Sequence, residues 1–565
     1  MKEHSGGKSS SLKIIGLSVA ILVLVALVIV AVVFLYNPHI SVPGDYRTIQ
    51  EAIDAADDGE VIVVEPGVYY EQIDFMGKSI TVRSTNPEDP EVVSETTIDG
   101  RRRSSVVTFQ SGEGEDAVLE GLTLTGGVGT LETIAYVEDG EEDEVEGYIG
   151  GGIIVKAGSS PTIINNFIVG NNAELEGGGI AVLGNSDPVI RYNLIEGNTA
   201  YSGAGIKVWE SSPIIEENTF RQNQAFYLGG AIAVDLESSP SISGNEIYNN
   251  SATGGGGIFV LNSNPLITGN LIERNTSIWY GGGIFIDNCS PTVDSNDISK
   301  NRADNFGGGI AVSGSSTPTF SNNQINDNYS EESGGGIAVI EGADPNIIDN
   351  IISDNTVLLG GGGIFIKGAS ATINSNNIFK NRVQQDGGGI AILNESTVEI
   401  FGNIIDENMA GRAGGAMVIG EDSASVLEDN TISSNVAATG GGLLVQQSTL
   451  TMKNNVLSDN AAMGGSGGAI IMVLNTVAEI TGNDFIGNIA VEFGGGIVAF
   501  EQSVVMLRLN NFTDNEAYLG GGAFVGQDEA SIDLNDPDDN TYSGNMPEDV
   551  EEEQSEDNGE VGDED

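Results

Sequence analysis

The sequence predicts an all-β protein built as a parallel β-helix, from its repeat, its short apolar runs and its glycine content. A glycine-rich cluster followed by Ile or a similar residue recurs every 26 or 27 residues, from residues 150–153 to residues 521–524. The 565 residues include 79 glycines, roughly twice the usual share of about 7%. Each repeat holds three short runs with apolar residues at alternate positions, a pattern typical of strands. Three strands per repeat describe one coil, and we expect about 15 regular coils.

A second motif, Asn-x-(Ile/Leu/Phe/Tyr)-x-x-Asn, runs in phase with the first, from Asn166 to Asn545. In eight consecutive coils, from Pro161 to Pro345, a proline turn lies between the two motifs. Glycine permits bends where a Cβ atom would clash. The recurring asparagines should stack as a ladder that bonds backbone groups at the turns. The inward Ile, Val and Leu residues should form the core, each coil covering its neighbours.

The ends of the rod differ from its body of regular repeats, residues 150–545. Residues 41–149 are predicted to form the N-terminal cap and irregular early coils, and the apolar spacing at 49, 52, 53 and 56 predicts a capping helix over the open strand edge. Residues 131–147 contain eight acidic and no basic residues. We expect a solvated loop there, with a weak Ca²⁺ site as the alternative. Residues 546–565 form an acidic tail with the composition of a disordered segment.

The N-terminus predicts a membrane anchor. Residues 14–36 carry no charge and would span roughly 35 Å as a helix, more than a hydrocarbon core of about 30 Å. The leader, residues 1–13, holds three lysines and one glutamate, so it should stay in the cytoplasm. We therefore expect a single-pass membrane protein with one transmembrane helix and an extracellular, cell-surface β-helix. The alternative is a cleaved signal peptide, although the apolar run exceeds the usual length of about 7–15 residues.

Composition excludes several function classes. The 22 basic and 82 acidic residues give a net charge of −60, which repels phosphates and argues against nucleic acid as a partner. Cys289 is the single cysteine, and the two histidines are His4 and His39. The chain therefore has no intrachain disulfide and no Cys/His set for structural zinc.

Two early segments carry a family resemblance. Residues 46–53 (YRTIQEAI) and 61–71 (VIVVEPGVYYE) resemble the N-terminal cap and first coils of the pectin lyase-like superfamily. The body resembles right-handed parallel β-helix repeat proteins, and its repeats are also similar to those of chlamydial polymorphic outer membrane proteins. The resemblance spans about residues 41–545 and implies a right-handed parallel β-helix. For function it implies only a broad range that includes lyases, hydrolases, esterases, epimerases and adhesins.

The catalytic motifs of these relatives do not carry over. Polygalacturonases of this fold use three aspartates and a histidine, and this chain has no histidine after residue 39. Pectate lyases use Ca²⁺-binding carboxylates with an Arg or Lys base. The basic residues scattered through the early repeats are equally well interpreted as surface charges that relieve acidic repulsion: Lys207, Arg221, Arg274 and Lys300.

One region combines aromatic and acidic side chains. Tyr201, Tyr227 and Trp279 each lie four residues before the third position of a glycine cluster, with Phe226, Tyr280 and Phe306 beside them. Shortly after the clusters lie Trp209, Glu210, Asp235, Glu237 and Asp287. The predicted ligand-binding residues are Tyr201, Trp209, Tyr227, Trp279 and Tyr280, because outward rings can stack on sugars. The predicted metal residues are Glu210, Asp235, Glu237 and Asp287, with Ca²⁺ as the candidate cofactor.

Asp235 and Asp287 are also candidate catalytic residues. They are two coils apart, about 9–10 Å, near the upper limit of about 9.5 Å for the carboxylate pair of an inverting glycosidase. The alternative is that the aromatic residues pack over neighbouring coils and the carboxylates are solvated. The leading hypothesis is carbohydrate binding or adhesion without catalysis, with a polysaccharide as partner. A polysaccharide lyase or glycoside hydrolase is the second, and a structural spacer the third.

Overall fold

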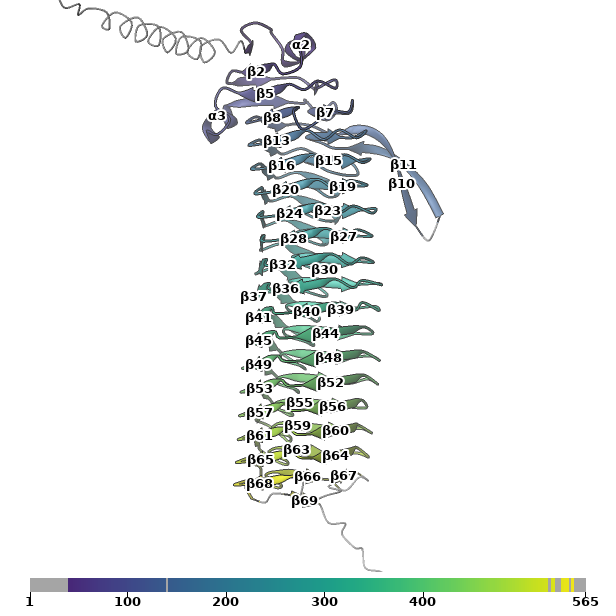
Figure 1. The fold of residues 1–565 in the computed structure, drawn as a ribbon, viewed down its shortest axis with the longest axis vertical. Coiled ribbons are helices and arrows are strands. Elements are labelled where there is room, and N and C mark those ends of the chain that lie inside the picture. Colours follow the sequence, from purple (N-terminus) through teal and green to yellow (C-terminus); the bar gives the residue numbers. More distant parts are fainter. Residues whose placement is uncertain (1–38, 139–140, 527–529, 534–539, 548–549, 553–565) are drawn as a thin grey trace, which may run out of the picture.

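The protein is a straight rod of stacked coils (Figure 1). The computed structural model describes residues 39–138, 141–526, 530–533, 540–547 and 550–552. These residues form a parallel β-helix of about 17 turns. The prediction of a right-handed parallel β-helix repeat is confirmed.

Each regular coil contributes strands to parallel sheets that run along the rod. Sheet I contains the strands that follow the glycine clusters, from β4 (Ile73–Asp74) to β69 (Val550–Glu552). Sheet II follows the proline turn, from β1 (Ile40–Val42) to β67 (Ser531–Asp533), and sheet III lies between the two asparagines, from β3 (Gly67–Tyr69) to β68 (Thr541–Ser543). A fourth sheet of 12 strands, sheet IV, precedes the glycine bend. It runs from β18 (Thr199–Ser202) to β62 (Ile489–Ala490).

The register advances by one repeat per coil, so equivalent residues lie above one another. In sheet I, Ile153 pairs with Ile180, which pairs with Ile206. These inward residues are fully buried in one core that runs along the rod. The last cluster is formed by residues 520–522, and Gly520 has the same φ of +63° as Gly494 in the coil before. Ala523 therefore takes the isoleucine position and pairs with Ile497, one residue earlier than the sequence motif placed it.

The glycine bend has two separate physical causes. Gly177 has a φ of +66°, the left-handed conformation that glycine tolerates. A Cβ atom on Gly178 would lie 2.4 Å from the carbonyl oxygen of Thr199 and 2.7 Å from that of Ala204. The first glycine therefore sets the direction of the chain, and the second lets the backbone of the next coil approach.

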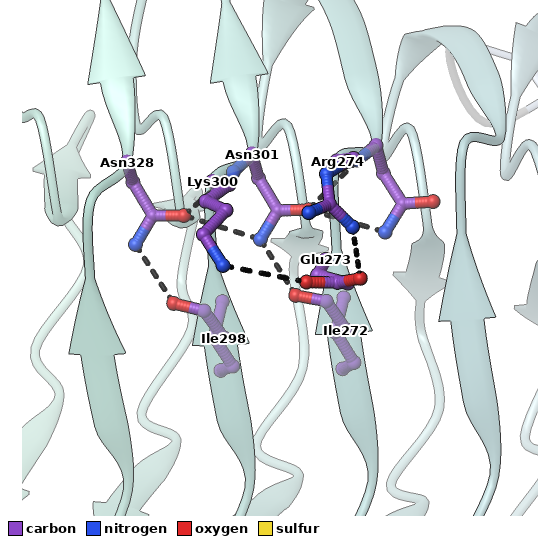
Figure 2. Close-up of polar contacts among 8 residues, drawn as sticks. Ile272, Glu273, Arg274, Ile298, Lys300, Asn301 and Asn328 are labelled. Atoms are coloured by element: carbon purple, nitrogen blue, oxygen red, sulfur yellow. Dashed lines mark hydrogen bonds and ion pairs between the residues drawn. The ribbon is translucent and has the colours of Figure 1, made fainter.

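The asparagines form two ladders, one at each end of the sheet III strands. Asn301 shows the pattern (Figure 2): its Nδ2 donates to the carbonyl oxygen of Ile272 at 2.8 Å and to Oδ1 of Asn328 at 3.1 Å. Its Oδ1 accepts from the backbone N–H of Asn275 at 2.9 Å. Because these buried side chains satisfy backbone groups that the turns leave unpaired, the two ladders stabilise the bends at both ends of the sheet III strands.

A third ladder of hydroxyls lies at the proline turn. The backbone N–H of Ser186 donates to Oγ of Ser211, and that of Ser211 to Oγ of Ser238, both at 3.2 Å. Cys289 takes the same place in its coil, and its N–H donates to Oγ of Ser316 at 3.1 Å. Burial raises the pKa of Cys289 to about 11, so this thiol remains protonated at neutral pH and packs as a small core residue.

A short helix covers the first coil, as predicted. Helix α2 (Ile49–Ala55) buries Ile49, Ala52 and Ile53, and Oγ1 of Thr48 caps it by accepting from the N–H of Glu51 at 3.1 Å. The helix lies here because its apolar residues, which the helical spacing places on one face, pack against the open end of the core.

The predicted transmembrane helix requires a correction. The described residues contain two helices, α2 with seven residues and α3 (Pro90–Glu95) with six. Neither is long and apolar enough to cross a membrane, which takes about 20 residues. This finding contradicts the fold class with a transmembrane helix and the single-pass membrane localisation. The segment on which both predictions were based, residues 14–36, lies outside the described residues.

Within the segment 131–147, expected to be a solvated loop, residues 131–138 and 141–147 lie in two antiparallel strands. Strands β10 (Thr130–Glu138) and β11 (Glu141–Ile149) form a hairpin that projects sideways from the rod (Figure 1). Its base is anchored, because Ile134 and Ile149 are buried in an apolar cluster with Trp209. The hairpin therefore covers the outer face of sheet I in the first coils.

Candidate functional site

Four aromatic rings form an exposed ridge on the early strands of sheet IV. Tyr201, Phe226, Tyr227 and Trp279, here called the aromatic ridge, are 41%, 76%, 37% and 46% exposed. The ring centroid of Tyr201 lies 5.8 Å from that of Phe226 and 5.5 Å from that of Tyr227. Trp279 meets Tyr227 edge-on at 6.4 Å. The rings thus support one another while their outer faces remain accessible.

Two β-bulges place the ridge on the surface. Strands β22 (Gln224–Leu228) and β30 (Thr276–Tyr280) have five residues, whereas β26 (Ser251–Gly254) between them has four. The register shifts in both pairings, so an extra residue stands out in β22 and β30. A bulge redirects side chains, and here it exposes Phe226 and Trp279.

A shallow cleft of about 540 Å³ lies beside the ridge. Phe226 and Ile278 flank it, and Arg302 and Asp304 lie at its end. The guanidinium of Arg302 pairs with Asp304 at 3.1 Å and also with Glu331. The cleft therefore places polar groups that can bond hydroxyls next to exposed apolar rings.

The other two predicted ring residues do not join the ridge. Trp209 is 6% exposed, under the hairpin. Tyr280 is half-buried on the outer face of sheet I, between Phe285 at 5.1 Å and Phe306 at 6.0 Å. Burial, and then the nearby carboxylates of Glu341 and others, raise the pKa of Tyr280.

A buried ion cluster lies beside Trp209. The ammonium of Lys207 is 3.1 Å from Oε2 of Glu176 and 3.5 Å from Oδ2 of Asp235. It also lies 5.5 Å from the ring centroid of Trp209. Burial alone would lower the pKa of Lys207, but the charges of Glu176 and Asp235 and their hydrogen bonds outweigh it and raise this pKa. Lys207 is therefore charged at neutral pH and is not the surface charge that the sequence suggested.

The remaining basic residues of the early coils do lie at the surface in ion pairs. Arg274 and Lys300 both pair with Glu273, the lysine at 3.7 Å (Figure 2). Arg221 pairs with Glu196 at 2.8 Å. These exposed pairs offset part of the acidic charge of the rod and contribute little stability individually.

The predicted acidic residues are not gathered around one point. Asp235 is engaged with Lys207, and Asp287 accepts a hydrogen bond from Oγ of Ser313 at 2.8 Å. In the coil between them, Leu261 is the residue that pairs with Asp287. Within the described parts of the chain, no three His, Cys, Asp or Glu side chains come together to hold a metal ion.

Glu210 and Glu237 lie together at the surface. They line a small polar depression with Asn185 and Asp187 at the turn after sheet I. Both glutamates have left-handed backbone conformations, with φ of +48° and +55°. The metal role of these carboxylates stays a prediction.

A groove of about 700 Å³ runs along the outer face of sheet I in later coils. Phe306 and Phe365 stack at its upper end with centroids 5.9 Å apart. Small residues such as Gly360 and Ala391 line part of its wall. A Cβ atom on Gly360 would lie at ordinary contact distance, 3.5 Å from the ring of Phe365. Charged residues stand at its rim, including Lys367 and Asp386. The groove therefore has many polar and charged residues among its apolar ones, a more polar lining than a typical small-molecule site has.

Some of these features have signals in the sequence that lie outside the repeat pattern. The spacing from Asn223 to Gly229 is one residue longer than that from Asn198 to Gly203, which marks the bulge. Lys207 stands in a column of apolar residues, between Ala181 and Ala233 in the neighbouring strands, which marks a buried charge. The groove had no such signal, because it depends on side-chain size in several coils.

The family model that describes the right-handed β-helix region matches residues 136–272, 228–360, 256–423 and 335–536. Among solved structures, a PL6-family alginate lyase, AlyGC, is similar at 13% identity over 89% of this chain and 98% of that one, with a TM-score of 0.24. The A-module of the mannuronan C-5 epimerase AlgE6 of Azotobacter vinelandii is similar at 11% identity over 90% and 94%, with a TM-score of 0.22. No curated protein sequence matches the chain.

The family match agrees with the ladders of the structure. The matched stretches together run from residue 136 to residue 536, more than half of the chain. The parallel pairing from one coil to the next extends over the same residues. The chain therefore belongs to the right-handed β-helix family.

Proposed function

We propose that this protein binds a carbohydrate chain through the aromatic ridge. The observation that carries the proposal is the exposure of four contiguous rings, Tyr201, Phe226, Tyr227 and Trp279, on a rigid sheet. Exposed rings of this kind bind the apolar faces of sugars and leave the hydroxyls to polar neighbours. Arg302 and Asp304 in the adjacent cleft supply such neighbours.

The charge of the rod narrows the class of carbohydrate. The net charge of −60 disfavours an acidic polysaccharide unless cations screen the repulsion. A neutral polysaccharide meets no such cost. The proposal is therefore a neutral glycan, bound along the rod because the rings follow its long axis, from β18 through β22 to β30.

Binding is proposed rather than catalysis. Asp235 is in a buried ion cluster with Lys207, and Leu261 lies in the coil that separates Asp235 from Asp287. Neither carboxylate lines the cleft beside the aromatic ridge. The rings, in contrast, need no further group to bind a sugar.

The test is binding of the full chain to an array of neutral and uronic-acid oligosaccharides, followed by titration calorimetry with the best neutral binder. Trp279→Ala and Tyr227→Ala should each weaken binding about two- to tenfold, since a lost ring contact is worth about 0.5–1.5 kcal/mol. Tyr192→Ala is the matched control, because Tyr192 is 55% exposed at a turn away from the ridge. If Trp279→Ala and Tyr227→Ala bind neutral glycans as tightly as the control Tyr192→Ala, the proposal is refuted.

A further inference from the structure

The lower half of sheet IV carries an exposed apolar stripe that the aromatic ridge does not use. Its most exposed members are Met463 at 66%, Val491 at 54% and Tyr518 at 74%. Met409 and Ile489 are each 47% exposed. Apolar patches of this kind on a soluble surface mark contact sites, and we call this one the apolar stripe.

The stripe is built from registered columns. In the first column Arg382 pairs with Met409, Met409 with Val436, Val436 with Ala461, Ala461 with Ile489, and Ile489 with Glu516. The column thus has a cation at one end, four apolar residues in the middle and an anion at the other end. Met463, Val491 and Tyr518 stand beside it in the same coils.

Two copies of this column match in charge when they run in opposite directions. A two-fold axis between the coils of Val436 and Ala461, perpendicular to the rod, places each column against its own copy in the opposite direction. Arg382 then faces Glu516 of the second copy, and Met409 faces Ile489. A parallel arrangement would instead place Arg382 opposite Arg382, which costs energy through like-charge repulsion.

A second pair of charges follows the same symmetry. Arg412 lies in the coil of Met409 and Glu492 in the coil of Ile489, each three residues after its column residue. The same two-fold axis places Arg412 of one copy next to Glu492 of the other. Arg412 also pairs within its own chain with Asp386, with Nε 2.7 Å from Oδ1.

We infer that the apolar stripe joins two copies of this chain as an antiparallel dimer. The net charge of −60 repels a second copy over most of the surface. The stripe instead has an apolar column with complementary charges at its ends, and the charged pair beside it, Arg412 and Glu492, is complementary as well. A second rod of the same fold also presents side chains at the same coil spacing of about 4.8 Å, so the two columns match over their whole length. The contact is isologous, as in most homodimers.

The size of the contact sets its strength. Six coils give a length of roughly 25–30 Å, which places the contact at the low end of interface sizes, where about 800 Å² per partner is standard. We therefore expect a dissociation constant of the order of 100 μM. The overlap leaves both aromatic ridges uncovered, since these lie in earlier coils, and the dimer would present them at opposite ends.

Sedimentation velocity of the full chain over a range of concentrations tests the inference. The wild-type chain should change from monomer to dimer with concentration. Met463→Asp should abolish the dimer, because it buries an unpaired charge at the contact. Arg382→Glu and Glu516→Arg should each weaken the dimer about tenfold, and the double variant Arg382→Glu/Glu516→Arg should restore it to within about twofold.

Arg508→Glu is the control, because it makes the same charge change at an exposed position of sheet II, where Arg508 pairs with Thr481. It should leave the dimer unchanged. A wild-type chain that stays monomeric at about ten times the expected dissociation constant would overturn the inference. A dimer that the charge swap fails to restore would overturn the antiparallel arrangement, and a dimer that Met463→Asp leaves intact would overturn the stripe as its contact.

Discussion

At the scale of single residues, buried polar groups define the local structure. The asparagines and serines of the ladders bond the backbone of the neighbouring coil, so each has a partner above and below. Lys207 differs, because its partners Glu176 and Asp235 are charged side chains on either side of its own coil. A buried charge that loses its partner is costly, and this gives a test.

Lys207→Met should destabilise the rod by about 3–5 kcal/mol at neutral pH, because it leaves Glu176 buried without a cation. The raised pKa of Lys207 means that the stability it contributes is complete below its unfolded pKa of about 10.4. That stability is lost as the pH rises through the folded pKa. The wild type should therefore show no change from this group between about pH 6 and 9. The variant should recover part of its deficit as the pH falls and Glu176 binds a proton. Urea denaturation at several pH values measures both effects.

Lys207→Met/Glu176→Gln serves as the companion variant. It removes both charges, so it should be more stable than the single variant at neutral pH and should lose the pH dependence. Single and double variants of equal stability at every pH would mean that the two side chains are not coupled.

At the scale of elements, irregular features decide what the surface presents. The bulges in β22 and β30 expose the ridge, and the hairpin β10–β11 buries Trp209. The two faces of the hairpin differ: Ile134 is buried against the rod, whereas Leu131 is 49% exposed. The hairpin is thus a cover for the outer face of sheet I, held by few residues.

Ile134→Asp should detach the hairpin and expose Trp209, because a carboxylate is costly in an apolar cluster. In a Trp279→Phe background, Trp209 is the remaining tryptophan, so its fluorescence emission should shift to the red and become accessible to quenchers. Leu131→Asp on the exposed face of the hairpin should leave the emission unchanged. An unshifted emission in Ile134→Asp would contradict the covering role.

At the scale of the whole molecule, the acidic charge acts over the length of the rod. Because the charge of −60 repels itself, added salt should stabilise the rod as the screening length falls from about 30 Å at 0.01 M to about 8 Å at 0.15 M. The temperature of unfolding should rise with NaCl and equally with choline chloride at the same ionic strength.

The same measurement with CaCl₂ tests the predicted Ca²⁺ site. If the carboxylates Glu210 and Glu237 bind Ca²⁺, stabilisation should saturate at a concentration too low to change the ionic strength, and Glu210→Gln/Glu237→Gln should abolish it. A response to CaCl₂ that follows ionic strength alone would contradict a discrete site at these residues.

The repeat in the sequence was sufficient to predict the parallel β-helix, its core and its capping helix. This is because each coil repeats one local pattern: glycine where the chain bends, asparagine where the turn needs bonds, and an apolar residue at each inward position, as at Ile153, Ile180 and Ile206. In such a fold each residue pairs with the residue at the same position of the next repeat. The local sequence pattern that forms one coil therefore also determines the pairing between coils.

Only the tertiary structure decided which aromatic residues face outward and which charges are buried. Tyr201, Tyr227 and Trp279 gather at the surface, whereas Trp209 lies under a hairpin whose acidic composition suggested a loop. The groove beside Phe365 and the apolar stripe likewise depend on side chains from several coils. Exposure is set by the size and position of neighbours a full repeat away, and the local pattern that determines the coil leaves these outward side chains unspecified.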